Sequence, residues 1–162
     1  MAIHTLDDGL SAWWRQLPQV FRLTEENVPS TSKDMLPKIL LMNIVYHQSL
    51  CALHASMVPL FCWSECNGDW SFSRQMSAQV AFEHAGTVSK LIQVVLSSYE
   101  RLSAMPSFIA YAAYCGCAIQ IPFMWCLNES VRDTVRRNVQ ANVKMIHTMA
   151  DSWKFAGILV CI

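Results

Sequence analysis

Apolar positions recur along this chain with the period of α-helices. The longest apolar run extends from Leu36 to Cys62, and its apolar side chains surround the axis almost completely when they are projected at about 100° per residue. Its polar residues fall on two narrow lines, Asn43, His47 and His54 on one and Lys38, Ser49 and Ser56 on the other. This pattern predicts a helix that is buried on most sides, and Pro59 should bend or end it.

Further helices are predicted on both sides of this run. The pattern predicts helices over residues 6–17, 73–99 and 107–127, a fourth that begins after an N-cap at Asn128 or Ser130, and a fifth from Trp153. Pro122 should kink or split the helix over 107–127. Residues 18–35 form a polar, proline-containing loop, and the Asn67-Gly68-Asp69 sequence predicts a turn within 64–70.

The helix after residue 128 carries one clear apolar stripe. Its members recur at intervals of three or four residues: Val131, Val135, Val139, Val143, Ile146 and Ala150. Residues at these intervals share one face of a helix. We therefore expect this stripe to be the face that packs against the other helices.

The fold predicted from these patterns is an all-α, multi-helix bundle. No stretch shows the strict alternation of a half-buried strand, and glycine is scarce. Residues 1–35 should form a short helix and a loop that lead into the domain, and residues 36–162 its helical core.

Composition restricts the environment of the chain. Lys and Arg balance Asp and Glu, so no global charge draws the chain to nucleic acid or an anionic membrane. The apolar content of 53% is high for a free-standing domain, which implies that lipid or further protein covers part of the surface. The seven cysteines are odd in number and follow no secretory signal, so we expect free thiols in a reducing compartment.

A small multi-span membrane protein is the alternative interpretation. Two apolar segments reach the length of about 20 residues that a bilayer requires. The first of them, however, carries Asn43, His47, Gln48 and His54, which are costly in hydrocarbon. Lys and Arg also lie on both sides of the segments without asymmetry. The pattern favours buried helices, and no membrane partner is expected.

The most metal-like group of side chains is His47, Cys51 and His54, which share one helix face. The two histidines stand two turns apart, about 10 Å along the axis, whereas zinc holds its ligands about 2.0–2.3 Å from one point. We therefore predict no metal site and no cofactor, and expect these histidines and Asn43 to meet partners where helices cross.

Other candidates for chemistry are weaker. Cys115 and Cys117 point about 200° apart on a helix, and Cys62 and Cys66 could meet only if the helix continued through Pro59. Glu83 and His84 are adjacent in sequence and should be surface residues. No nucleophile–base–orienter set occurs, so we predict no catalytic residues and no enzyme. Four cations form a basic side after residue 128, which we expect to be a solvated face: Arg132, Arg136, Arg137 and Lys144.

Long stretches of the chain resemble a known family. They are LSAWWRQLPQVFRL from Leu10, LPKILLMNIVYHQSLCALHASMVPLFCWS from Leu36, SFSRQMSAQVAFEHAGTVSKLI from Ser71 and MPSFIAYAAYCGCAIQIPFMWCLNESVRDTVRRNVQANVKMI from Met105. In this order they are similar to the middle-homology regulatory domain of fungal zinc-cluster transcription factors. The resemblance covers nearly the whole chain from about Leu6.

The resemblance implies a nuclear, non-enzymatic regulatory segment of a factor that controls transcription by RNA polymerase II. In such a factor the helical domain lies between a DNA-binding zinc cluster and activation sequences. The six-cysteine cluster is absent from this sequence, so this chain should hold no zinc and no DNA-binding residues. The family also implies protein partners and a small-molecule effector that the sequence does not name. We expect the chain to be a fragment, incomplete at its C-terminus, that associates with itself when made alone.

Overall fold

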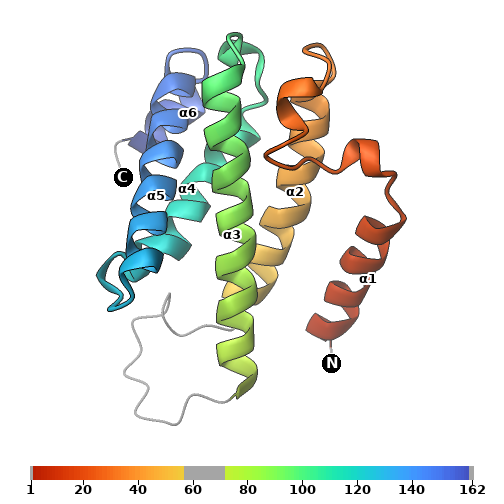
Figure 1. Ribbon diagram of the computed structural model, residues 1–162, viewed down its shortest axis with the longest axis vertical. Coiled ribbons are helices and arrows are strands. Elements are labelled where there is room, and N and C mark those ends of the chain that lie inside the picture. Colours follow the sequence, from red (N-terminus) through yellow and green to blue (C-terminus); the bar gives the residue numbers. More distant parts are fainter. Residues whose placement is uncertain (1, 57–71, 161–162) are drawn as a thin grey trace.

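The computed structural model describes residues 2–56 and 72–160. These residues form six α-helices and several short 3-10 turns, and no strand occurs among them (Figure 1). The predicted all-α, multi-helix bundle is thereby confirmed. Pro59, Cys62, Cys66 and the predicted turn over 64–70 lie outside the described residues.

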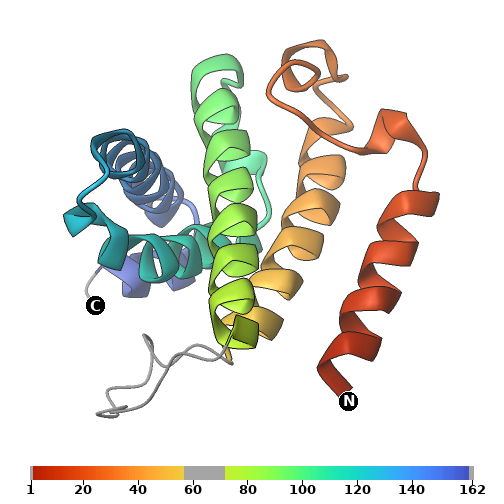
Figure 2. The same ribbon diagram turned by 60° about the horizontal axis from the view of Figure 1, so that its bottom comes forward.

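The bundle is built around helix α3 (Phe72–Ser98), which lies between α2 (Leu36–Ala55) on one side and α5 (Glu129–Ala150) on the other (Figures 1 and 2). Helix α4 (Phe108–Gln120) packs against α3 and α5, and α6 (Lys154–Val160) closes the far end against α5. The largest fully buried side chains come from four helices and one connecting turn: Leu40, Ile44, Leu50, Leu91, Ile92, Met105, Ile109, Met145 and Met149.

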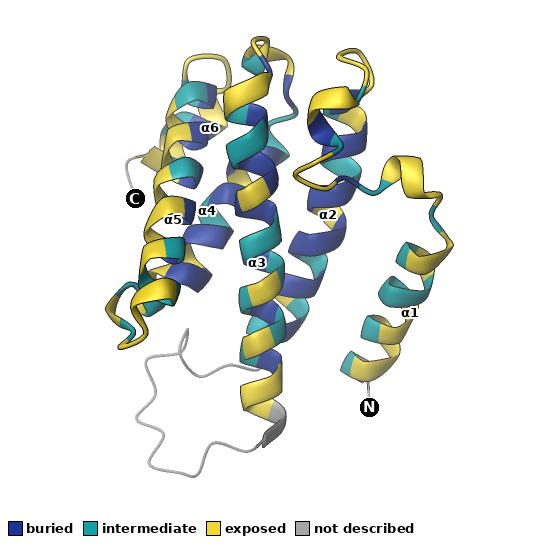
Figure 3. Cartoon of the chain, in the orientation of Figure 1, coloured by how far each residue is buried: buried dark blue, intermediate teal, exposed yellow. Residues whose placement is uncertain are grey.

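Helix α1 (Ala2–Gln16) is the outermost element. Among the described helices, it makes substantial contact only with α2. It begins four residues before the predicted helix over 6–17, and its exposed side chains contrast with the buried faces of α2 and α3 (Figure 3). Trp14 provides its attachment, since its ring stacks on Tyr46 of α2 with centroids 4.1 Å apart and an interplanar angle of 3°.

The polar loop after α1 is fastened to α2 by Asn43. This fully buried amide accepts a hydrogen bond from the Leu23 backbone N–H at 2.8 Å and donates to the Phe21 and Ile39 carbonyls at 2.7 Å. Two 3-10 turns, Gln19–Phe21 and Val28–Ser30, lie within the loop. Asn43 thus satisfies backbone groups where the loop crosses the helix, and not at a crossing of two helices as predicted.

Proline and asparagine set the boundaries of α4 and α5 largely as predicted. The α-helix ends at Gln120, and a 3-10 turn over Ile121–Trp125 contains Pro122. Asn128 is the N-cap of α5, and its side chain accepts a hydrogen bond from the Val131 N–H at 3.3 Å. Ser107 occupies the N-cap position of α4 but makes no capping bond with its side chain.

The predicted valine stripe of α5 is wrong as a description of its buried face. Val143 is exposed and Val131 and Val139 are only half-buried. The face that packs consists of Val135, Asn138, Asn142, Met145, Ile146 and Met149. A row of i, i+4 positions advances about 40° at each step. From Val131 to Val143 it has wound about 120° around the helix and has left the contact.

Candidate regulatory groove and buried polar groups

The three residues of the predicted metal-like group lie on the side of α2 that faces α3, but they meet different partners. His47 Nδ1 lies 2.7 Å from His84 Nδ1, and Cys51 Sγ lies 3.5 Å from the Ala81 carbonyl oxygen. His54 is 3.4 Å from Ser77 Oγ through Nδ1 and 3.5 Å from Asp7 Oδ2 through Nε2. No group of three or more metal-ligating side chains occurs in the described part of the chain.

His84 was expected at the surface, and the structure corrects this expectation. Its ring is half-buried and forms a hydrogen-bonded pair with His47, whereas Glu83 is exposed. Burial lowers the pKa of His47 to about 3, and burial with the nearby His54 lowers the pKa of His84. Both rings are therefore neutral at pH 7, and one donates its Nδ1 proton to the other. The pair joins α2 to α3.

The cysteines of the described helices are packed thiols. Burial raises the pKa of Cys51 to about 12 and that of Cys117 to about 11, and it also raises the pKa of the half-buried Cys115. A thiol is a nucleophile or metal ligand as its thiolate. These three side chains are protonated at neutral pH and contribute apolar surface to the helix contacts.

The predicted basic side of α5 divides into paired and unpaired cations. Arg132 and Arg136 lie 3.6 and 4.0 Å from carboxylates one turn earlier on the same helix. Arg137 and Lys144 have no carboxylate within ion-pair distance among the described residues. These two cations line an open groove of about 360 Å³ between α3 and α5, together with Gln93, Leu96, Ser97, Gln140 and Ala141.

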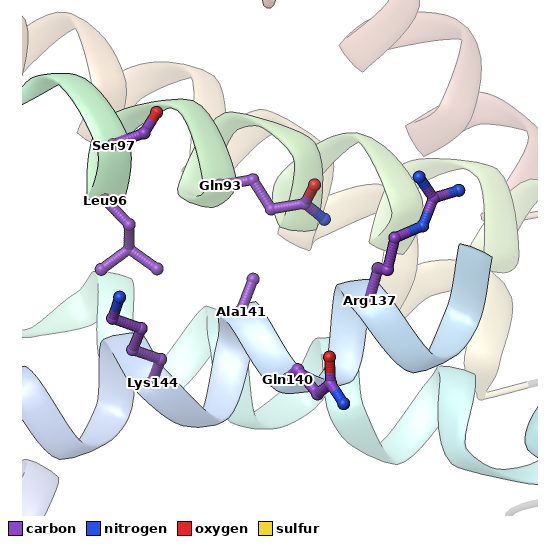
Figure 4. A pocket seen from close by; sticks show the side chains of 7 residues that line it. All are labelled: Gln93, Leu96, Ser97, Arg137, Gln140, Ala141 and Lys144. Atoms are coloured by element: carbon purple, nitrogen blue, oxygen red, sulfur yellow. The ribbon is translucent and has the colours of Figure 1, made fainter. Parts of the chain in front are cut away.

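Figure 4 shows how the groove is arranged. Arg137 and Lys144 stand at its two ends, with Gln93 of α3 and Ala141 of α5 between them. The two cations are seven positions apart on the helix, which corresponds to about 10 Å along the axis. The groove therefore presents two positive groups on either side of a mixed amide and methyl surface, an arrangement that suits an anionic or polar partner.

A network of buried amides lies beneath this groove and was not predicted from the sequence. Gln93 Nε2 donates to Asn138 Oδ1 at 2.8 Å, and Asn138 Nδ2 donates to Gln120 Oε1 at 2.7 Å. Gln120 Nε2 donates to Ser89 Oγ at 2.9 Å, which also accepts from Asn142 Nδ2 at 2.9 Å. The network thus links α3, α4 and α5 through side chains that are buried, except for the half-buried Gln93.

A signal for this network was present in the sequence. Asn138 and Asn142 stand one turn apart on the helix face that also carries Val135, Met145 and Met149. Gly116 supplies the necessary space, because a Cβ atom at that position would lie 3.0 Å from Asn142 Nδ2.

The chain matches no protein-family model, no curated protein and no solved structure.

Proposed function

We propose that this chain is a regulatory, non-enzymatic segment of a fungal transcription factor that controls transcription by RNA polymerase II in the nucleus. Two lines of support lead to this proposal. Stretches over most of the sequence resemble the middle-homology domain of zinc-cluster factors, and the helical bundle agrees with the fold that this resemblance implies. In this proposal DNA is bound by a zinc cluster outside this chain, and the bundle restrains an attached activation region.

The observation that carries the proposal is the double role of Gln93. Its side chain lines the groove between α3 and α5, and it also donates to the buried Asn138. A partner or effector that binds Gln93 in the groove competes for that hydrogen bond. Because Asn138 is joined through Gln120 to α4, the competition alters the packing of three helices. Binding of a partner in the groove can therefore change the packing of the helices, as regulation by a bound partner requires.

Activation of a reporter gene tests the proposal. The chain is placed between an unrelated DNA-binding domain and an unrelated activation domain in yeast, and it is compared with a flexible linker of equal length. We expect at least a fivefold lower reporter signal with the chain. Gln120→Leu should restore part of the signal, whereas Gln79→Leu, at an exposed glutamine of α3, should not. Equal reporter signals at equal protein abundance, with nuclear localisation of both fusions, contradict the proposal.

A membrane protein is the second candidate, and one helix favours it. Among the described residues, the 18-residue segment Phe108–Trp125 is long and apolar enough to cross a membrane, although 44% of it is buried inside the bundle. Its Gln120 is fully buried and bonded to α3 and α5, which gives this amide the polar partners that it would lack against lipid. Retention in the membrane pellet after a carbonate wash would favour this second candidate, and release would reject it.

A further inference from the structure

A second groove lies on the opposite side of the bundle, between α1 and α2. It has a volume of about 430 Å³ and is lined mostly by apolar side chains, chiefly Leu10 and Trp13 of α1 and Leu41, Met42 and Val45 of α2. Trp13 is 44% exposed and Val45 is 42% exposed. A large aromatic ring and a branched side chain thus face an open groove between two helices, a setting that suits an apolar helix face.

A basic groove continues directly from the apolar one. It has a volume of about 340 Å³, and the two grooves share Lys38 and Leu41 as lining residues. Its charged lining consists of three cations, Lys33, Lys38 and Arg101, and one carboxylate, Asp34. None of the three cations lies within ion-pair distance of a carboxylate among the residues that the structure describes.

The order of the apolar and basic parts along α2 determines which ligand fits the groove. Val45 and Lys38 are seven residues apart on the same helix, which places the apolar and basic parts about 10 Å from each other. A helical ligand that follows the groove covers the same distance in two turns. Its apolar stripe would cover Trp13 and Val45, and carboxylates two turns away would meet the cluster around Lys38.

We propose that this continuous groove is a docking site for an amphipathic peptide helix whose apolar stripe is followed by acidic residues. The proposal rests on the proposed regulatory function, because it names the chemistry of the segment that the bundle restrains. Apolar contact with Trp13 supplies most of the affinity, and the cations fix the direction of the peptide along the groove. The same segment would leave the groove when salt screens its carboxylates.

Binding of a synthetic peptide to the full chain tests this proposal. The probe is a fluorescein-labelled 16-residue helix with three leucines at one-turn spacing followed by four glutamates. Its control has glutamines in place of the glutamates. We expect micromolar binding of the acidic peptide by fluorescence anisotropy, at least tenfold weaker binding of the glutamine peptide, and a marked loss of affinity between 50 and 500 mM salt.

Variants of the chain separate the two parts of the groove. Trp13→Ala should weaken both peptides at least tenfold, and Lys38→Glu should weaken only the acidic one. Lys154→Glu, at an exposed cation of α6 that lines none of these grooves, should change neither. Far-UV circular dichroism verifies that each variant is folded. Equal affinity for the two peptides, or unchanged binding by Lys38→Glu, overturns the proposal.

A second copy of the chain is the competing occupant, and sedimentation decides between them. A dimer at micromolar concentration that Trp13→Ala abolishes assigns the groove to self-association and overturns the peptide proposal.

The reporter assay and the peptide-binding assay can fail independently of each other. Normal reporter repression without peptide binding rejects the docking site alone, and peptide binding without repression rejects the regulatory function.

Discussion

Replacing Gln120 with leucine should destabilise the fold by about 1–3 kcal/mol, because it leaves a buried donor without a partner. Gln120 is fully buried, and its Oε1 is the acceptor for Asn138 Nδ2 at 2.7 Å. Ser89 Oγ would lose one donor but would keep the hydrogen bond from Asn142 and its own bond to the Ala85 carbonyl. Asn138 Nδ2, which is left without an acceptor although Asn138 Oδ1 keeps its bond from Gln93, therefore accounts for most of the expected loss.

A double-mutant cycle isolates the free energy that the hydrogen bond between Gln120 and Asn138 contributes to stability. Asn138→Leu alone leaves Gln120 Oε1 without its donor, and the double variant Gln120→Leu, Asn138→Leu removes both buried partners at once. The double variant should be more stable than the sum of the two single losses predicts, by about 1–2 kcal/mol. Gln93 loses its acceptor in that variant, but its half-buried side chain can bond to water.

Urea unfolding followed by circular dichroism measures each free energy of unfolding. Gln79→Leu is the matched control, since Gln79 lies exposed on α3 and bonds only to the exposed Glu83 side chain at 2.6 Å. The control should shift stability by less than about 0.5 kcal/mol. If Gln120→Leu is as stable as the native chain, or if the two single effects simply add, the network does not join the helices as argued.

Three further predictions concern other parts of the fold. Burial holds the pKa of His47 at about 3 in the folded state against 6.5 in the unfolded chain, so the unfolded chain binds the proton first as the pH falls. The free energy of unfolding should therefore decrease as the pH drops from about 6.5 towards 3, by several kcal/mol at most. Acid unfolding curves measure this decrease. Gly116→Ala should lower stability by about 1–3 kcal/mol, because its Cβ would lie 3.0 Å from Asn142 Nδ2 and the amide would have to move; thermal unfolding should show a lower Tm. Asn43→Ala should release the loop over residues 18–35, because it leaves the buried Leu23 N–H without an acceptor, and hydrogen exchange there should quicken while exchange in the core of α3 stays slow.

Much of the helical architecture could be predicted because it depends on local chemistry. Pro122 interrupts a helix wherever it stands in one, and Asn128 caps a helix through a bond to a residue three positions later. Neither effect requires knowledge of a distant partner. The all-α class follows in the same way from the spacing of apolar residues.

The errors arose where the outcome depends on a second helix. The buried face of α5 includes Asn138 and Asn142 because Gln120 and Ser89, on two other helices, offer them hydrogen bonds. The predicted stripe consisted of apolar residues only and therefore left these two amides out. His84 is half-buried for the same reason, since His47 of α2 meets its ring across the helix contact. The grooves could not be located either, because each is formed by residues of two or more elements.

A reporter assay tests the regulatory account most directly. It uses the fusion that carries this chain between a DNA-binding domain and an activation domain. The account predicts repression relative to a flexible linker, and partial release by Gln120→Leu, which breaks the bond joining α4 to Asn138 of α5. Gln79→Leu should repress as strongly as the native chain. An activation signal that is the same for the native chain, both variants and the linker, with all four fusions nuclear and equally abundant, would contradict it.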